Sequence, residues 1–415
     1  MSTNILCLFI LLMYGSFCMA DSTIRIATFN ASLNQCRVVD GLCLEGELIN
    51  DLSNGRDRKA SRIAELIQRI DPDIILLNEF NYDSMGTAAD LFQLNYLSIG
   101  QNLSRSDEPG SPIEFPFRFL APSNTGIHSG FDLDNDGHIS GDVGSADYGN
   151  DAFGFGEFPG RYGMLLLSKY PIAMEQSRTF QNFLWKDMPD ALLPDQRRTP
   201  ETGDWYSNEE LAKLPLSSKS HWDVPIRVDG RTVHVLASHP TPPVFDGSED
   251  RNGKRNHDEI RFWNDYISGS DGDYIVDDRG AAGPLPADAS FVITGDLNSD
   301  PDRGDSLQEA IRNLLDNPRV NTSLTPVTHT GSDITSTFNL RVDYVLPSRD
   351  LEMTSATVFS AESLDPLRRL LNASDHRPVW VDVQFVPEPM HTPWCVAIPF
   401  AMCLTRGRRI LSAST

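Results

Sequence analysis

Short apolar runs, each followed by a polar side chain, recur along the sequence and predict strands buried in a sheet. Residues 291–293 form one such run, after which Asp296 and Asn298 stand two positions apart. Residues i and i+2 of an extended backbone point to the same side, so we expect these two side chains to project together from a strand end. Residues 23–29 alternate between polar and apolar positions and lead directly to Asn30.

The same patterns assign most of the remaining chain. Apolar residues spaced three and four apart predict helices, whereas continuous or alternating apolar runs predict strands. Asp229-Gly230 separates two such runs and favours a tight hairpin turn. Helices are predicted over residues 56–70, 254–267 and 306–315, and further strands over residues 73–79, 163–168, 224–228, 232–238, 340–346 and 379–385.

Residues 100–160 are rich in Gly, Pro, Asp and Ser and show little periodicity. A connection of this length is uncommon within a compact domain, which indicates a functional insertion. Inside it, Asp132, Asp134 and Asp136 alternate before a glycine and match the first half of a calcium loop. The second half departs from the motif, because position twelve is Val143. The alternative to a structural Ca²⁺ site is an acidic turn at the surface.

The chain has 415 residues, of which 40% are hydrophobic, and a formal net charge of −23. This hydrophobic content is enough for a substantial core. Since no internal repeat or convincing linker is evident, residues 21–386 are predicted to form one domain. A strongly acidic surface gives no general attraction to nucleic acid, whose binding depends on neutralising phosphates. It leaves metal binding open.

Both ends of the chain have features of an exported protein. Residues 1–20 hold an apolar core too short to span a membrane, typical of a signal peptide, with an uncleaved anchor as the alternative. In the tail, residues 387–415, a Pro-Glu-Pro motif is followed by an apolar patch and then by arginines. This order resembles PEP-CTERM sorting signals, which sorting machinery would process. A plain C-terminal extension is the alternative. Cys36 and Cys43 are close enough to close a small loop in an oxidising compartment.

The polar residues at the predicted strand ends fall into six short segments with a distinctive order. The segments are Ala27-Thr-Phe-Asn30, the run from Asp71 to Glu79, Ser238-His239, Gly295-Asp-Leu-Asn298, Arg341-Val-Asp-Tyr344 and Ser374-Asp-His376. Each is weakly informative alone, but together they resemble the endonuclease/exonuclease/phosphatase superfamily, in a secreted bacterial branch. The resemblance implies an α+β fold, a four-layer αββα sandwich, and metal-dependent hydrolysis of a phosphoester.

The resemblance also implies a role for each polar residue. Glu79 would be the principal ligand of a divalent metal, Mg²⁺ before Ca²⁺, with Asn30 and Asp375 at or beside it. Asp296 would orient or deprotonate the attacking water. The remaining implied roles are contacts to phosphate from Asn298 and His239, and a second histidine, His376, oriented by Asp343.

Two further groups are candidates for binding substrate phosphate. Arg161 and Tyr162 stand where the resemblance to apurinic endonucleases places a tyrosine. Arg251 and Arg255 belong to a basic cluster in an otherwise acidic chain and would suit a second phosphate. The alternative for this cluster is the solvated beginning of the predicted helix over residues 254–267.

These features together predict a secreted, metal-dependent phosphoesterase that acts on a monoester or a diester, in a small molecule or a nucleic acid. An extracellular nuclease is the second interpretation, and the net charge weighs mildly against it. The third is a catalytically silent binding or surface protein with the same fold, although none of the core polar positions is missing. No stable protein partner is indicated.

Overall fold

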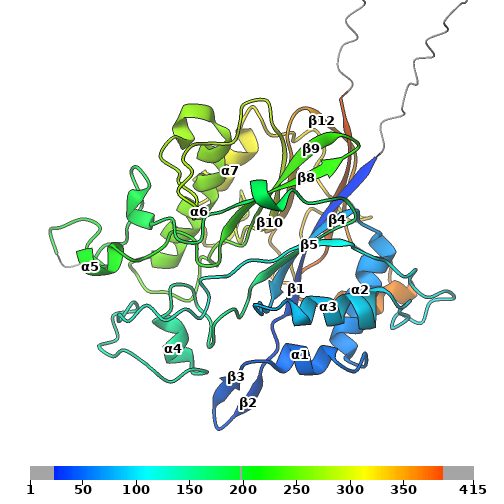
Figure 1. Ribbon diagram of the computed structural model, residues 1–415, viewed down its shortest axis with the longest axis horizontal. Coiled ribbons are helices and arrows are strands. Elements are labelled where there is room, and N and C mark those ends of the chain that lie inside the picture. The colour runs from blue at the N-terminus through cyan, green and yellow to red at the C-terminus, as the bar shows by residue number, and fades with distance from the viewer. Residues whose placement is uncertain (1–22, 197–198, 387–415) are drawn as a thin grey trace, which may run out of the picture.

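Residues 23–196 and 199–386, which the computed structural model describes, form two large β-sheets packed face to face (Figure 1). The predicted signal peptide, residues 1–20, and the predicted tail, residues 387–415, lie outside the described residues and stay predictions. Over the two described ranges, no helix is long and apolar enough to cross a membrane.

Each sheet has one parallel pair of strands near its middle, and its other pairs are antiparallel. The first sheet has the order β12 (Leu351–Val358), β13 (Val379–Phe385), β1 (Ile24–Leu33), β4 (Ile74–Phe80), β6 (Met164–Ser168) and β5 (Phe117–Phe119). The second has the order β11 (Asp343–Pro347), β10 (Ser290–Asp296), β9 (Arg231–Ser238), β8 (His221–Val228) and β7 (Arg178–Thr179). The parallel pairs are β1 with β4 and β9 with β10.

Helices cover the outer face of each sheet, so the chain is a four-layer αββα sandwich, as predicted. One side carries α1 (Glu47–Leu52), α2 (Arg58–Ile70) and α3 (Thr87–Phe92), and the other carries α6 (Arg251–Ile267) and α7 (Glu309–Asp316), as Figure 1 shows. Shorter helical segments are α4 (Ala146–Asn150), α5 (Asn208–Leu211), a π-helical turn (Gln93–Leu97) and the 3-10 turns Met174–Gln176, Trp185–Asp187, Gly269–Gly272 and Pro366–Asn372.

The alternation of side chains along each strand explains why the central strands are apolar on both faces. On β4, Ile74 and Leu76 point into the core between the sheets, whereas Ile75 and Leu77 pack against α2. On β10, Val292 faces the inner core, and its neighbours face α6 and α7. A strand covered on both faces reads as a continuous apolar run, which is the pattern that predicted these elements.

Most predicted elements are present with shifted ends. Helix α2 begins at Arg58 and not at residue 56, because the Asp57 side chain accepts a hydrogen bond from the Ala60 backbone and caps the helix. The predicted hairpin is confirmed: Asp229 and Gly230 join β8 to β9, with φ of 50° and 83°. The 100–160 region contains little regular structure, as predicted, whereas β12 was missed.

A disulfide between Cys36 and Cys43, with Cα atoms 5.4 Å apart, closes the small hairpin of β2 (Arg37–Val39) and β3 (Leu42–Leu44). The Cys43 backbone donates to the Gly144 carbonyl oxygen at 2.8 Å. The hairpin is thereby fastened to the long insertion.

Replacing Gly295 by alanine should destabilise the protein by about 3 kcal/mol or more, as strain and a steric clash combine. Gly295 has a φ of +153°, and a Cβ atom there would lie 2.0 Å from the Ser238 carbonyl oxygen of the neighbouring strand. The measurement is urea unfolding, with Gly141→Ala as the control because nothing lies within 4 Å of a Cβ at that glycine. Equal stability of the two variants would contradict the expectation.

Candidate active site

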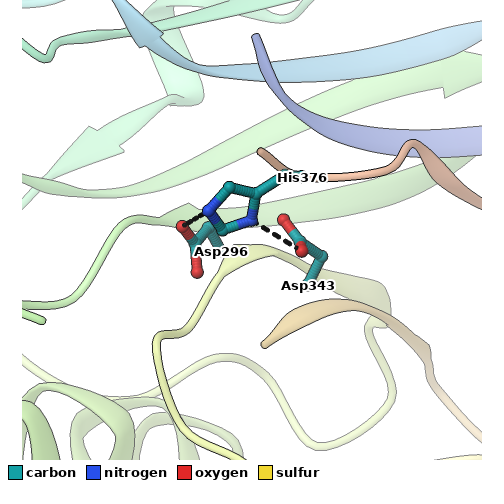
Figure 2. Close-up of side chains that lie close together, drawn as sticks. All are labelled: Asp296, Asp343 and His376. Carbon is teal, nitrogen blue, oxygen red and sulfur yellow. Dashed lines mark hydrogen bonds and ion pairs between the residues drawn. The ribbon is translucent and has the colours of Figure 1, made fainter. Parts of the chain in front are cut away.

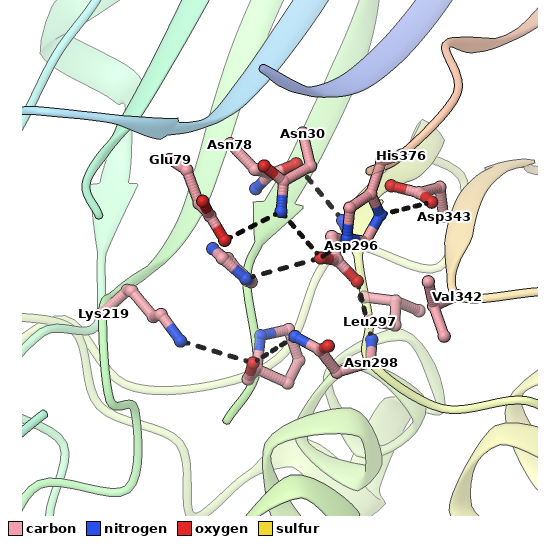
Figure 3. A network of polar contacts seen from close by, with 12 residues as sticks. Asn30, Asn78, Glu79, Lys219, Asp296, Leu297, Asn298, Val342, Asp343 and His376 are labelled. Carbon is pink, nitrogen blue, oxygen red and sulfur yellow. Dashed lines mark hydrogen bonds and ion pairs between the residues drawn. The ribbon is translucent and has the colours of Figure 1, made fainter. Parts of the chain in front are cut away.

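The ends of β1, β4 and β10 meet at one edge of the two sheets, where they bring together Asn30, Glu79 and Asp296 (Figure 3). The Asn30 side-chain amide donates to Glu79 Oε1 and to Asp296 Oδ2, in both cases at 3.0 Å. A single buried amide therefore links a carboxylate of the first sheet to a carboxylate of the second.

His376 lies between two buried carboxylates (Figure 2). Its Nδ1 atom is 2.9 Å from Asp343 Oδ2, and its Nε2 atom is 3.6 Å from Asp296 Oδ2. Although burial lowers the pKa of His376, the charges of Asp343 and Asp296 raise that pKa to about 10. Burial raises the pKa of Asp296 to about 7, with the Asp343 charge adding to the effect and the His376 charge opposing it.

Ligand-type atoms of Asp296, Asp343 and His376 lie within 4.8 Å of one another, close enough to suggest a metal site. His376 lies within reach of both carboxylates, 2.9 Å from Asp343 Oδ2 through Nδ1 and 3.6 Å from Asp296 Oδ2 through Nε2, so an imidazolium there could donate to both. We therefore interpret this cluster as a group that holds and moves protons.

His239, at the end of β9, also faces Asp296, with Nε2 3.6 Å from Asp296 Oδ2. Burial lowers its pKa well below the usual value, and the nearby charges of Lys219 and His376 lower it further. Its buried Nδ1 atom has no hydrogen-bond partner in the part of the chain that the structure describes. A neutral imidazole with a free polar atom is ready to bind a group that arrives with the substrate.

Asn298 reaches the site in a different way from the one predicted. Its φ is +53°, so the backbone turns after Asp296 and is not extended. The Asn298 backbone donates to Asp296 Oδ1 at 3.0 Å, and its side-chain amide donates to the Pro240 carbonyl oxygen at 3.1 Å. Asp296 and Asn298 therefore do not lie on one extended strand as their spacing predicts, although both residues belong to the same site.

The residues around Glu79 fit a divalent cation. Glu79 has a φ of +56° and forms no ion pair with any residue of the described ranges. Its Oε1 and Oε2 atoms accept only amide hydrogens, from Asn30 at 3.0 Å and from Asn34 at 2.6 Å. A partly buried carboxylate without a cationic partner, surrounded by amide groups, provides hard oxygen donors of the kind that Mg²⁺ and Ca²⁺ prefer.

Asp375 lies at the exposed side of the same region. Its Oδ1 atom accepts a hydrogen bond from the Ser32 hydroxyl at 3.3 Å, and Ser374 Oγ donates to the Asn30 carbonyl oxygen at 2.7 Å. These contacts bring Asp375 beside the β1 end that supplies Asn30.

Sequence reasoning did not identify Asn34 or Asn78. Asn78 is fully buried on β4, where its Oδ1 accepts from the Asp296 backbone at 3.2 Å and its amide donates to the Ser238 carbonyl oxygen at 3.4 Å. The only available indication was its position: a polar residue directly before Glu79 in an otherwise apolar strand.

Arg161 and Tyr162 are engaged with one another and with Glu157. The Arg161 guanidinium forms an ion pair with Glu157 and lies 4.5 Å from the centre of the Tyr162 ring. Burial raises the pKa of the Tyr162 phenol to about 12, while the Arg161 charge opposes the shift and the charges of Glu157 and Glu79 add to it. Their predicted contact with phosphate stays a prediction.

The basic cluster at the beginning of α6 is neither a solvated helix end nor a free anion site. Arg255 is buried, and its guanidinium donates to three backbone carbonyl oxygens at 2.7 to 2.9 Å, those of Phe153, Pro215 and Leu216. Arg251 forms an ion pair with Glu249 and lies over the Trp205 ring. Because these contacts use both guanidinium groups, they do not support a phosphate site, and the binding of substrate phosphate by Arg251 and Arg255 stays a prediction.

The predicted calcium loop has its three carboxylates gathered, with ligand-type atoms of Asp132, Asp134 and Asp136 within 4.8 Å of one another. Backbone amides of the loop donate to these carboxylates; that of Gly137 donates to Asp132 Oδ2 at 2.8 Å. Burial and the Asp136 charge raise the pKa of Asp134. An acidic turn accounts for the same contacts, so a bound Ca²⁺ stays a prediction.

The sequence model of the Endonuclease/Exonuclease/phosphatase family matches residues 27–376, which include every residue of the site described above. The chain therefore belongs to this family. Its members are metal-dependent phosphoester hydrolases that act on phosphoesters or nucleic acids, and this protein is an enzyme of that class.

A search of curated proteins gives no match to the sequence. Among solved structures, an endonuclease/exonuclease/phosphatase from Beutenbergia cavernae is 16% identical, with a TM-score of 0.48 over 88% of this chain and 72% of that chain. Sphingomyelinase C from Streptomyces griseocarneus is 15% identical, with a TM-score of 0.43 over 87% and 99%. The human Nocturnin catalytic domain is 13% identical, with a TM-score of 0.45 over 88% and 96%.

Proposed function

We propose that this protein is an exported hydrolase that cleaves a phosphate monoester or diester by attack of a water molecule activated at Asp296. One observation carries the proposal: Asp296 Oδ2 lies 3.6 Å from the Nε2 atoms of both His239 and His376, and 3.0 Å from the Asn30 amide. A buried carboxylate at the meeting point of two imidazoles and an amide suits the control of protons and of developing charge.

Asp296 would take the proton of the attacking water. A general base is most effective when its pKa lies near the working pH, and burial raises the pKa of Asp296 to about 7. His376 would donate through Nε2 to a phosphate oxygen, because Asp343 holds its Nδ1 hydrogen. Neutral His239 would donate a second hydrogen bond, so that both imidazoles stabilise negative charge that develops in the transition state.

Glu79 would hold the divalent metal, assisted by Asn30, Asn34 and Asp375. When bound, Mg²⁺ would polarise the phosphoryl group and stabilise its developing negative charge. The unpaired Glu79 carboxylate and its two amide neighbours support this assignment. Mg²⁺ is preferred to Ca²⁺ in the proposal, as in the sequence-based prediction.

A screen of phosphoester substrates tests the proposal. Bis-p-nitrophenyl phosphate, p-nitrophenyl phosphate, phytate and plasmid DNA would each be incubated with the protein and Mg²⁺, with and without a chelator. We expect chelator-sensitive release of nitrophenol from at least one of the two nitrophenyl esters. Cleavage of plasmid DNA alone would favour the nuclease interpretation, and no hydrolysis of any substrate would contradict the proposal.

Export is supported by the apolar leader, the tail and the Cys36–Cys43 disulfide, since disulfides persist mainly in oxidising compartments. We expect the mature protein to lack residues 1–20, and the tail after residue 389 to be a further site of processing. Intact-mass measurement on protein from the native host decides this. A soluble cytoplasmic protein with both ends intact would contradict export.

A further inference from the structure

Lys219, which stands two residues before β8, is a buried cation beside the candidate active site. It is 6% exposed, and its ammonium makes one hydrogen bond, to the Pro240 carbonyl oxygen at 3.5 Å. Within residues 23–196 and 199–386 it forms no ion pair. Lys219 was not among the residues predicted from the sequence to contact the substrate.

An ammonium in this position has little to compensate for its burial. Removing a charge from water is costly unless the charge is paired and its hydrogen-bonding groups are satisfied. Burial lowers the pKa of Lys219, and the charges of Glu259, Glu79 and Asp296 oppose that shift. Glu259 makes the largest of these contributions, and the other two carboxylates belong to the catalytic site.

The direction of the Lys219 side chain also points to the site. Its Nζ atom and the Asn298 amide nitrogen donate to the same acceptor, the Pro240 carbonyl oxygen, at 3.5 Å and 3.1 Å. Pro240 directly follows His239. In Figure 3, Lys219 lies on the side of the cluster where Glu79 lies, Asn298 lies on the side of Asp296, and the two side chains extend toward one another. An ammonium has three donor hydrogens and uses one here, so it retains donors for an incoming oxygen.

Glu259, a fully buried carboxylate of α6, fixes the two segments that meet at this point. Its Oε1 atom accepts from the Ser218 backbone at 2.7 Å, directly before Lys219. Its Oε2 atom accepts from the Thr241 backbone at 2.6 Å, directly after Pro240. One side chain therefore sets the position of the lysine relative to the loop that carries His239.

We propose that Lys219 donates a hydrogen bond to a non-bridging phosphate oxygen of the substrate, beside Asn298, and that Glu259 is the residue that positions Lys219. The proposal rests on the proposed function, because it assigns a further contact to the phosphate that this site would bind. The alternative is that Lys219 only fastens the Pro240 loop to the segment before β8.

The test measures binding of inorganic phosphate by calorimetry without added metal, so that it does not depend on turnover. Lys219→Met should weaken phosphate binding about 10- to 100-fold, as expected when a charge-assisted hydrogen bond is lost. Lys219→Gln provides a second variant of similar length. Lys213→Met removes the same charge from an exposed position six residues earlier in the sequence and should leave the affinity unchanged.

Thermal unfolding separates the two roles of Lys219. The variant Lys219→Met should melt at or above the wild-type temperature, because it removes a buried charge that has no paired carboxylate. Added phosphate should raise the melting temperature of wild type more than that of the variant. A folded variant that binds phosphate as tightly as wild type would overturn the proposal. If wild type also hydrolyses the nitrophenyl esters, that result would contradict only the role of Lys219 and not the proposed function.

A double-mutant cycle tests the role of Glu259. Glu259→Gln should weaken phosphate binding in wild type but add little to the loss already present in Lys219→Met, because the carboxylate acts through the lysine. Equal losses in both backgrounds would show that Glu259 supports the fold and not Lys219. If the wild-type protein neither binds phosphate nor hydrolyses any ester, both the proposed function and the role of Lys219 would be contradicted.

Discussion

Replacing Glu79 by glutamine should lower phosphoester turnover by about three orders of magnitude or more while leaving the protein folded. Glutamine preserves the shape of the side chain, so the change removes the negative charge on which metal binding would depend. The Asn30 and Asn34 amides, which donate to this carboxylate at 3.0 Å and 2.6 Å, would then face a carboxamide. Steady-state kinetics on the nitrophenyl esters in Mg²⁺ measures the loss.

Glu352→Gln, at an exposed position on β12, provides the matched control and should have normal activity. Mg²⁺ should also raise the melting temperature of wild type and of this control, but not that of Glu79→Gln, since a cation stabilises the protein only where it binds. Near-normal turnover by the folded Glu79→Gln variant would contradict the assignment of Glu79 as a metal ligand.

The second large effect concerns Asp296 and His376. Asp296→Asn and His376→Ala should each reduce kcat by about three to four orders of magnitude, and the double variant should lose at most about tenfold more. The physical reason is the chain of contacts from Asp343 through His376 to Asp296, in which each group fixes the protonation of the next. Once one member is absent, the other has no partner on which to act.

The measurement is a double-mutant cycle on kcat, with circular dichroism to confirm folding. His376→Ala leaves the Asp343 carboxylate buried without its imidazole, so a lower melting temperature is expected for this variant. His329→Ala, at an exposed histidine, controls for general effects of histidine removal. Multiplicative losses in the double variant would indicate that Asp296 and His376 act independently.

The sequence predicts the layers of the fold well because a strand that is buried on both faces has a continuous run of apolar residues. Strands such as β4 and β10 contain an uninterrupted apolar run, Ile74 to Leu77 and Phe291 to Ile293, and polar residues follow that run near the end of each strand. β12 alternates between buried Leu351 and Met353 and exposed neighbours, but the alternation is lost in its second half, Ser-Ala-Thr-Val, where only Val358 is buried. An edge strand is weakly marked in this way, and it was missed.

The site is predictable only in part, since backbone turns and burial decide where a polar side chain goes. Asn298 follows Asp296 at a spacing that suits a strand, but its left-handed backbone turns the chain. On α6, the charges of Arg255 and Glu259 suggest a solvated face, and both side chains are buried against neighbouring loops. Lys219 has no periodic context, because it lies in a segment without regular structure before β8.

The buried side-chain amide of Asn78 limits how far the alignment of the two sheets can change during evolution. Apart from the Asn30 contact with Asp296, most of that interface is made of apolar side chains, and apolar contacts favour no single alignment strongly. Asn78 bonds to the backbones of Asp296 and Ser238 on the opposite sheet and so selects one alignment. Exchanges among Val, Ile and Leu around it should be tolerated in related sequences. An aliphatic residue in place of Asn78 would leave the opposing groups unsatisfied and the two halves of the catalytic centre free to slide.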